Sequence, residues 1–377
     1  MQTARYNLVV DGQFGSTGKG LIAGYLAWKY RPEILGTTNG PNSGHTCVDV
    51  VGSEARSFVA KALPSPAILN AWYDDYNPLV VVGPSASFHL NRMLEEITAC
   101  NLNPENLWIH KRAGVVTQAH REAEASPETG TKHLASTGQG GGAFLADKIM
   151  RRPGLKLAGD YEELKDYIGN NTNIQAIFLM NRLKNGATAL HEGSQGFSLD
   201  INHGHSYPQC TSRQCTAAQC VADMGIAMKC IGDIYMVIRP YPIRVGNVVE
   251  DGKTVGFSGG HYPDQQEIDW QIVGTSAGMP QDEIDALNKR ELTTVTKRLR
   301  RVFTFSEIQL REAAAINGAT KIALNFSNYL DYNVYGVNTI TGLTPKVFQF
   351  IERVEKVSGV KVALVGTGPR VDQVVEL

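Results

Sequence analysis

The feature that most constrains the fold is an alternation of short β-branched runs with longer amphipathic stretches. The first run, Asn7 to Val10, is joined by a glycine turn to a helical pattern from Gly18 to Tyr30. A second run, Leu79 to Val82, precedes a helical pattern that continues through Ile97. Such an alternation is typical of strand–helix–strand units with parallel strands. We therefore predict an α/β fold.

Further apolar runs predict more buried strands of the same sheet. Several of them are followed at once by glycine or polar turns, and ligands of open α/β sheets usually bind at those strand ends. We expect the functional site there. The runs are Ile174 to Leu179, Ala187 to Leu190, Ile234 to Ile238, Ile322 to Leu324 and Val362 to Val365.

The chain shows no internal repeat and no low-complexity linker along its 377 residues. We therefore predict a single domain, residues 1–377, with surface elaborations. The polar, glycine-rich segment Asn247 to Gly260 is predicted to be a surface insertion, and Gly138 to Gly142 a loop within the fold.

The composition excludes several classes of protein. With 42% apolar and 19% charged residues the chain can bury a large core, so it is not disordered. A net charge of −1 argues against a nucleic-acid-binding surface built on bulk positive charge. The sequence lacks the roughly 18 to 20 apolar residues that a membrane helix needs. We expect a cytoplasmic protein, in the host cytoplasm if it is viral, whose six cysteines are reduced thiols.

The loop Asp11-Gly-Gln-Phe-Gly-Ser-Thr-Gly-Lys-Gly20 follows the first strand and opens the first helix. In that position, backbone N–H groups and a lysine can hold phosphates. The pattern departs from a standard P-loop because Gly20 replaces the usual hydroxyl residue and the glycine spacing is one residue longer. Phosphate binding and a simple helix-entry turn both remain open at this point.

A second polar loop, Asn39-Gly-Pro-Asn-Ser-Gly-His-Thr46, contains one histidine. Such a loop can present His45 as a proton donor to a developing oxyanion. A lone loop histidine is also common on protein surfaces, so the loop alone does not decide between the two interpretations.

The order of the remaining motifs resolves these alternatives. Together with the two loops, they resemble the adenylosuccinate synthetase family from Leu8 to Pro369. The motifs are Ala135-Ser-Thr-Gly-Gln-Gly-Gly-Gly142, His191-Glu-Gly-Ser-Gln-Gly-Phe-Ser-Leu-Asp-Ile-Asn-His-Gly204, Ile243-Arg-Val-Gly246, Glu291 to Arg301, and Gly366-Thr-Gly-Pro369.

The resemblance implies a P-loop-related fold with a largely parallel central sheet, helices on both faces, and a homodimeric enzyme. It also implies a ligase reaction in which a γ-phosphate is transferred to O6 of a purine monophosphate and aspartate then displaces it from C6. The implied catalytic residues are Ser16, Lys19, His45 and Gln195, with Mg²⁺ held by Ser16 and Gly44. The implied contacts of the phosphate donor are Gly15, Ser16, Thr17, Gly18, Lys19, Gly20, Asn328, Gly366, Gly368 and Pro369.

The resemblance places the purine monophosphate and the aspartate on further residues. Arg151 matches an arginine that reaches the nucleotide phosphate in the other subunit. The aspartate would lie on the loop of Thr294, Val295, Thr296 and Arg298, whose hydroxyl and guanidinium donors complement a carboxylate. The monophosphate contacts are Asn42, Ser136, Thr137, Arg151, Gln195, Leu199, Thr211 and Val245.

Ser16 departs from the family, because it stands where the family has a catalytic aspartate. A hydroxyl is a poor base at neutral pH, and its small, neutral side chain leaves space beside N1 of the purine, where the 2-amino group of guanine projects. The same replacement resembles the phage branch of the family, the 2-aminoadenylosuccinate synthetases, which act on dGMP. Two alternatives are an ordinary adenylosuccinate synthetase acting on IMP and a catalytically impaired nucleotide-binding homologue.

The segment Leu324-Asn-Phe-Ser-Asn328 also departs from the family, which has a lysine and an aspartate there for the guanine of GTP. Asn328 offers one donor and one acceptor, the pattern that the edge of adenine requires, and Phe326 could stack on the base. We therefore expect ATP or dATP as the phosphate donor. Gln139 stands where the family usually has arginine, and we give no physical account of that change.

Overall fold

The computed structural model describes residues 5–126, 131–169, 174–293 and 297–377. A nine-stranded sheet forms its centre, and all neighbouring strands in it are parallel except the last pair, β17 and β18. This confirms the predicted α/β class. The strand order is β18 (Val374–Glu376), β17 (Val362–Gly366), β16 (Lys321–Leu324), β10 (Ile231–Ile238), β1 (Arg5–Asp11), β9 (Thr188–Glu192), β2 (Ile34–Thr37), β5 (Leu79–Val82) and β7 (Leu107–Ile109).

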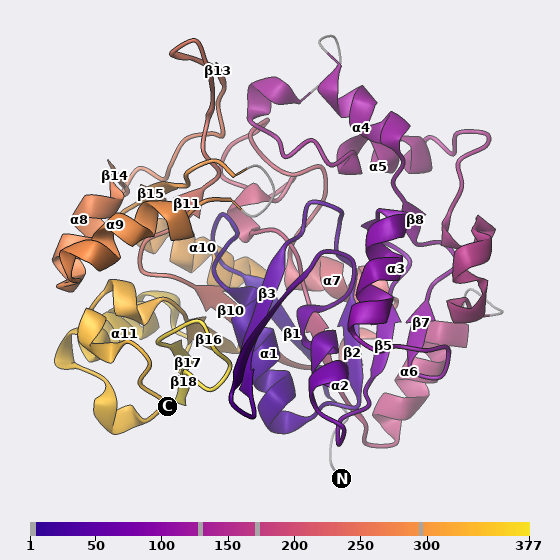
Figure 1. Cartoon of the computed structure of the whole chain (residues 1–377), viewed down its shortest axis with the longest axis horizontal. Coiled ribbons are helices and arrows are strands. Elements are labelled where there is room, and N and C mark those ends of the chain that lie inside the picture. Colours follow the sequence, from indigo (N-terminus) through magenta and orange to yellow (C-terminus); the bar gives the residue numbers. More distant parts are fainter. Residues whose placement is uncertain (1–4, 127–130, 170–173, 294–296) are drawn as a thin grey trace.

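Helices cover both faces of this sheet (Figure 1). Successive side chains of a strand point to opposite faces, so Val9 packs into one hydrophobic core while Leu8 and Val10 pack into the other. The first core includes residues of α1 (Lys19–Tyr30), α2 (Leu69–Trp72) and α3 (Leu90–Ala99). The second includes residues of α6 (Ile174–Lys184), α7 (Ala217–Met224), α10 (Glu307–Asn317) and α11 (Pro345–Ser358).

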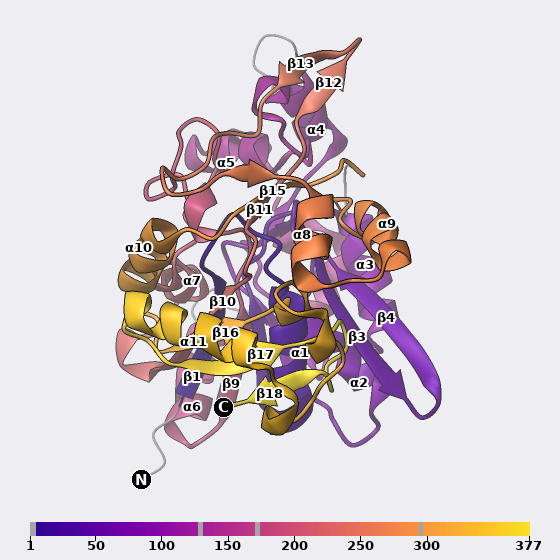
Figure 2. The same ribbon diagram turned by 90° about the vertical axis from the view of Figure 1, so that its left-hand side faces the viewer.

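Smaller elements surround one end of the sheet. Figures 1 and 2 both show α4 (Gln118–Ala125), α5 (Gly141–Ile149) and the hairpin of β12 (Val248–Glu250) and β13 (Lys253–Gly256) at the end opposite the N-terminus. Because β1 begins near the N-terminus, α4, α5 and the β12–β13 hairpin lie toward the carboxyl end of β1. The hairpin lies within the predicted insertion Asn247 to Gly260, and its strand residues are mostly exposed.

A third, smaller core lies beside the sheet. It is formed by α8 (Trp270–Ala277), α9 (Gln281–Arg290) and a three-stranded sheet of β11 (Ile243–Arg244), β15 (Arg301–Phe303) and β14 (Glu267–Ile268). The remaining pairs are the hairpin of β3 (His45–Val51) and β4 (Glu54–Ala60), and β6 (Ser87–Phe88) with β8 (Gly114–Val115). The single-domain count stays a prediction.

Two local predictions were wrong. The run Ile174 to Leu179 belongs to helix α6, not to a strand. Its apolar character continues at helical spacing, so that Leu179 and Leu183, four residues apart, are both buried against the sheet. The glycine segment Gly138 to Gly142 is only partly a loop, because α5 begins at Gly141.

Within the described residues, no helix has both the length and the apolar character needed to cross a membrane.

Candidate active site

A cavity of about 520 Å³ lies where the loops that follow the parallel strands meet. It brings together segments that are far apart in the sequence, from the first loop to the C-terminal Gly366-Thr-Gly-Pro369 motif. Most of the residues predicted for the site contribute to its wall. Those residues are Gly15, Ser16, Gly18, Lys19, Gly20, Asn42, Gly44, His45, Thr137, Gln195, Leu199, Val245, Asn328, Gly368 and Pro369.

The first loop is organised around the buried carboxylate of Asp11. One oxygen, Oδ1, accepts hydrogen bonds from the backbone N–H of Gln13 at 2.8 Å and of Gly15 at 3.2 Å. The other, Oδ2, accepts from the Thr17 hydroxyl at 2.5 Å and from the Lys19 ammonium at 2.8 Å. The Thr17 side chain is therefore fully buried inside the loop and does not line the cavity.

Close backbone packing explains the glycines at the start of α1. A Cβ atom at Gly20 would lie 2.6 Å from the carbonyl oxygen of Thr46 and 2.7 Å from its nitrogen, closer than real Cβ atoms come. A Cβ at Gly18, where φ is +83°, would lie 2.0 Å from Nδ2 of Asn325. The hydroxyl residue of a standard P-loop cannot occupy position 20 because β3 crosses the helix start at Thr46.

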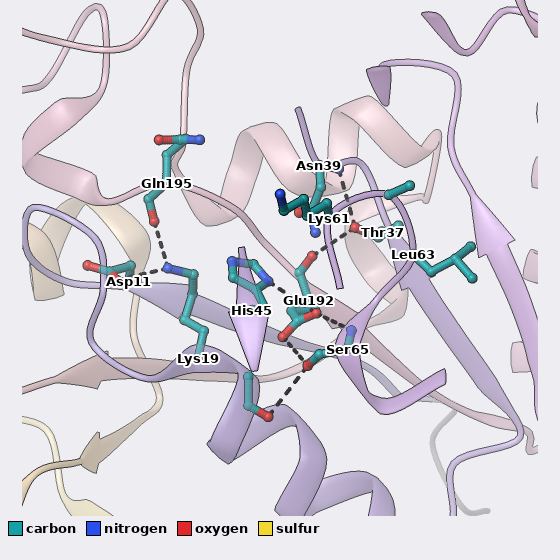
Figure 3. A network of polar contacts seen from close by, with 12 residues as sticks. Asp11, Lys19, Thr37, Asn39, His45, Lys61, Leu63, Ser65, Glu192 and Gln195 are labelled. Atoms are coloured by element: carbon teal, nitrogen blue, oxygen red, sulfur yellow. Dashed lines mark hydrogen bonds and ion pairs between the residues drawn. The ribbon is translucent and has the colours of Figure 1, made fainter. Parts of the chain in front are cut away.

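The loop that follows β9 packs directly against the first loop. The Lys19 ammonium donates a second hydrogen bond, of 2.8 Å, to the carbonyl oxygen of Gln195, as Figure 3 shows. Gln195 itself adopts a left-handed backbone conformation, with φ at +64°. A Cβ at Gly196 would lie 2.1 Å from the nitrogen of Gly15. Lys19, Ser16 and Gln195 are thereby held at one end of the cavity.

His45 is held by Glu192, a residue that the sequence analysis did not identify. The His45 Nδ1 lies 3.2 Å from Oε2 of Glu192, at an ion-pair distance without the alignment of a hydrogen bond (Figure 3). The amide and hydroxyl of Ser65 donate to the same carboxylate at 2.6 and 2.7 Å. Burial raises the pKa of Glu192, but His45 and Ser65 stabilise the carboxylate more strongly and the net pKa is lowered.

This carboxylate orients the imidazole. An anionic Glu192 beside Nδ1 favours a proton on that nitrogen, and His45 also contributes to the wall of the cavity. The neighbouring His191 is different, because it is fully buried and bonded to the Tyr6 hydroxyl at 2.8 Å. Burial lowers the pKa of His191 to about 3, which keeps it neutral and structural.

A second missed group is a buried ion-pair network in the wall of the cavity, formed by Glu291, Arg239, Arg300 and Tyr329. Glu291 contacts Nη2 of Arg239 at 3.2 Å and Nη1 of Arg300 at 3.3 Å, and it accepts a 2.7 Å hydrogen bond from the Tyr329 hydroxyl. Arg239 also donates to the carbonyl oxygen of Ser16 at 3.2 Å. The network therefore connects the first loop to the segment that begins the Glu291 to Arg301 motif. Nothing in the sequence pairs these residues.

Residues predicted to bind the donor base also line the cavity. Asn328 is buried, 7% exposed, and contributes to the wall, as do Gly368 and Pro369. The Arg239 guanidinium lies 4.0 Å from the centroid of the Phe326 ring, so that ring has a cation on one face.

Some predicted residues do not line the cavity. Gly366 is buried, and its carbonyl oxygen accepts from the Ser327 hydroxyl at 2.9 Å. Arg298 donates to the carbonyl oxygens of Ala135 at 2.8 Å and of Ser136 at 3.3 Å, which connects the predicted aspartate loop to the predicted monophosphate loop.

Thr211 and Arg151 also lie outside the lining. Thr211 donates its backbone N–H to the carbonyl oxygen of Leu199 at 2.7 Å. Arg151 is exposed at the end of α5. Thr294, Val295 and Thr296 lie outside the described residues.

Comparison with known proteins places this geometry in a family. The family model of adenylosuccinate synthetase matches residues 8–166 and 155–333. The chain is 36% identical over 326 residues to N6-succino-2-amino-2'-deoxyadenylate synthase of Cyanophage S-2L, covering 86% of this chain and 82% of the relative. It is 38% identical over 330 residues to the enzyme of the same name from Vibrio phage phiVC8, covering 86% of each chain. Adenylosuccinate synthetase of Methanocaldococcus jannaschii is 31% identical over 371 residues, covering 98% of this chain and 96% of the relative.

Solved structures agree with the sequence relatives. The succinoaminodeoxyadenylate synthetase of Cyanophage S-2L, bound to dGMP and to dATP as an energy donor, superposes with a TM-score of 0.79 at 34% identity and covers 99% of this chain and 95% of that one. Adenylosuccinate synthetase of Plasmodium falciparum, at 19% identity, shares the fold with a TM-score of 0.77 over 99% of this chain and all of that one. The chain therefore belongs to the adenylosuccinate synthetase family, whose members are ligases that form a C–N bond in purine nucleotide synthesis.

Proposed function

We propose that the protein joins L-aspartate to C6 of dGMP, with ATP or dATP as the phosphate donor, to give 2-aminodeoxyadenylosuccinate for the synthesis of 2-aminoadenine DNA. The observation that carries this proposal is the position of Ser16. It is exposed at the cavity wall, next to Gly15, whose Cβ position would lie 3.9 Å from Leu199 and 4.0 Å from Gln195. Leu199 and Gln195 are the residues that the family resemblance assigns to the purine base.

A neutral side chain at this place favours guanine. Guanine carries a 2-amino group beside N1, whereas hypoxanthine has only hydrogen there, and a serine leaves more room than an aspartate. The phage relatives, named for a 2-amino-2'-deoxyadenylate product, and the phage structure bound to dGMP support the same substrate. Ordinary adenylosuccinate synthesis from IMP remains the competing function, because archaeal adenylosuccinate synthetases match 98% of the chain.

In the first step, the γ-phosphoryl group moves from the donor to O6 of dGMP and ADP or dADP leaves. Lys19 faces the terminal phosphates. We assign His45 the imidazolium form, with its Nδ1–H toward Glu192 and its Nε2–H toward the oxygens between which the phosphoryl group passes, because only a protonated Nε2 can donate to their negative charge. In the second step, the amino group of aspartate attacks C6 and phosphate leaves. The N1 proton leaves in the first step, as O6 attacks the γ-phosphorus; Ser16 has no carboxylate to accept it, so we assign it to an oxygen of the phosphoryl group being transferred. In the second step the proton lost by the attacking amine leaves with the phosphate.

A magnesium ion fits the residues that line the cavity. The Ser16 hydroxyl and the Gly44 carbonyl are oxygen donors of the type that Mg²⁺ prefers, and both residues contribute to the wall. Among the described residues no cluster of three histidine, cysteine or acidic side chains could hold a metal by itself, which suits an ion shared with substrate phosphates. When bound, Mg²⁺ neutralises charge on the donor phosphates.

The donor is proposed to be ATP or dATP because of Asn328. Asn328 lines the cavity, and its side-chain amide supplies one donor and one acceptor, which suits the N1 and 6-amino edge of adenine. The phage structure with dATP as energy donor supports this assignment. A carboxylate at this position would instead accept from the N1–H and 2-amino group of guanine.

We further propose a homodimer in which Arg151 contacts the monophosphate bound by the other subunit. In the single chain this guanidinium is exposed at the end of α5 and away from the cavity lining, as such an arrangement requires. Arg151→Ala and Lys19→Met variants, each nearly inactive alone, should recover about a quarter of wild-type activity per site in an equimolar mixture, because one mixed site is intact. Activity no greater than that of the separate variants would contradict a shared site.

The experiment that tests the function measures ADP release by the purified protein with ATP, Mg²⁺ and aspartate, supplying dGMP, GMP or IMP in parallel, with the product mass confirmed. We expect dGMP to be used about tenfold or more efficiently than IMP, since a built-in contact or clash with one polar group is worth about 1–3 kcal/mol. Replacing ATP with GTP should lower turnover. Preference for IMP would contradict the proposed substrate and would identify the protein as an ordinary adenylosuccinate synthetase.

Ser16→Asp gives this experiment its matched variant. The longer, charged side chain is expected to lower kcat/KM for dGMP and to leave that for IMP unchanged or higher, because only guanine meets it with a 2-amino group. Unchanged or higher activity on dGMP would contradict the steric argument while leaving the ligase assignment intact.

A further inference from the structure

The Asp11–Lys19 ion pair lies at the cavity wall, to which Lys19 contributes. The two charged atoms are 2.8 Å apart, and the side chains of Lys19 and Asp11 are 3% and 0% exposed. A carboxylate beside a lysine that binds phosphate is at first sight counterproductive, because it competes with the phosphate for the same cation. The contacts of the pair resolve this difficulty.

An ammonium group has three N–H donors in fixed tetrahedral directions. In Lys19, one donates to Asp11 Oδ2 and a second to the carbonyl oxygen of Gln195, each at 2.8 Å. With two directions taken, the third is determined, and Lys19 lines the cavity in which the phosphates are proposed to lie. A flexible four-carbon side chain is thereby held in one orientation before any nucleotide arrives, which is the condition for electrostatic preorganisation.

Asp11 is held as firmly as the lysine that it contacts. Its second oxygen accepts the backbone N–H groups of Gln13 and Gly15, and Thr17 donates a hydroxyl to the oxygen that faces Lys19. These bonds fix the carboxylate relative to the loop that turns around the phosphates. The position of the Lys19 ammonium is therefore set by the backbone of the loop, through Asp11, and not by the conformation of the Lys19 side chain alone.

We infer that Asp11 is a positioning residue for phosphoryl transfer, which directs the free N–H of Lys19 at the terminal phosphate of the donor and at the same time weakens ground-state binding of that phosphate. This inference rests on the proposed function, because it takes Lys19 as the phosphate ligand. The negative charge of Asp11 repels the donor phosphates, whereas the orientation that it imposes favours the transition state.

The inference predicts a split between kcat and KM. Asp11→Asn replaces an acceptor with an NH₂ group that faces either Lys19 or the backbone N–H donors, so the lysine loses its orientation and the loop loses a negative charge. We expect kcat to fall about 10- to 100-fold, less than the roughly 10²- to 10³-fold cost of deleting an oriented donor because Lys19 itself remains, while KM for ATP stays the same or falls. Steady-state kinetics with saturating dGMP and aspartate measure both constants.

A double-mutant comparison separates positioning from loop stability. In a Lys19→Met background, Asp11→Asn should change the residual turnover less than twofold, because there is no ammonium left to orient. The control is Asp264→Asn, which removes a carboxylate that accepts hydrogen bonds from the Ser306 hydroxyl and from the N–H groups of Glu307 and Ile308 outside the cavity lining. That control should leave kcat and KM within twofold of wild type.

Two results would overturn the inference: a kcat for Asp11→Asn within threefold of wild type, or a KM for ATP that rises as kcat falls. If Asp11→Asn cannot be purified folded, Asp11→Glu replaces it under the same criteria, since it keeps the charge but moves the oxygens. Wild-type ADP release is measured in the same series. Absence of that release would instead contradict the proposed function, so the two failures can be told apart.

Discussion

Replacing His45 with alanine is expected to lower turnover by about 10²- to 10⁴-fold, the range for loss of a positioned proton-transfer or electrophilic group. The reason lies in its contacts: the imidazole lines the cavity with Lys19, and Glu192 holds its Nδ1 at 3.2 Å. Removing the ring leaves the phosphate loop and its hydrogen bonds intact, so the affinity for nucleotide should change little. Single-turnover kinetics and calorimetric titration with ATP measure the two quantities separately.

The matched control is His261→Ala, which removes an exposed histidine outside the cavity lining. It should leave turnover within twofold of wild type. A loss of less than threefold for His45→Ala would remove this histidine from the mechanism. A parallel loss of nucleotide affinity would show that it acts in binding rather than in the chemical step.

Replacing Glu291 with glutamine is expected to destabilise the folded protein by about 3–5 kcal/mol, the cost of breaking a buried ion pair by removing one partner. Glu291 is 3% exposed and compensates two arginines, Arg239 and Arg300, while it accepts the hydroxyl of Tyr329. A neutral amide would leave these buried cations without their counter-charge. Chemical denaturation followed by tryptophan fluorescence measures the change in the free energy of unfolding.

An exposed ion pair provides the control for this stability effect. Glu267 pairs with Arg301 through two short contacts, but its carboxylate is 43% exposed. Glu267→Gln should therefore cost about 0–1 kcal/mol. Equal costs for the two variants would mean that the Glu291 network in the cavity wall contributes no more to stability than a surface pair.

The same network sets the sign of a pH effect. Burial raises the pKa of Glu291, but the attraction of Arg239 and Arg300 and the Tyr329 hydrogen bond outweigh it, so the folded pKa lies below the ordinary 4.5. A lowered carboxylate pKa contributes stability that is fully present above pH 4.5 and is lost as pH falls through the folded pKa. The difference in stability between wild type and Glu291→Gln should therefore narrow in acid and stay constant above about pH 5.5.

Much of the fold followed from local sequence signals. The strand runs Asn7 to Val10, Leu79 to Val82 and Ile322 to Leu324 were predicted because β-branched residues bounded by turns indicate buried strands. The helix α6 was misread as a strand because a short apolar run does not distinguish the two structures; only its packing against the sheet, through Leu179 and Leu183, does so. Short strands such as β7 were missed for a related reason, since three residues carry almost no periodicity.

The chemistry of the site divides in the same way. The first loop, the loop that contains His45, and Ser16 could be predicted from local sequence, because each motif lies within about ten consecutive residues. The hydrogen bond from Lys19 to the carbonyl oxygen of Gln195 depends instead on the left-handed backbone conformation of Gln195, far along the chain. The residue type at position 195 does not predict that conformation. The contacts of Asp11 with the loop backbone, Thr17 and Lys19 likewise became evident only from the folded structure.

What the sequence alone determined is thus the class of fold, the family and most of the predicted residues that line the cavity. The tertiary structure decided how those residues are held. Strand β9 lies between β1 and β2, so Glu192 is in register with both Val9 and Thr37 and reaches His45. Strand order is set by long-range packing of the whole sheet, and a pattern of neighbouring residues does not specify which strands lie side by side.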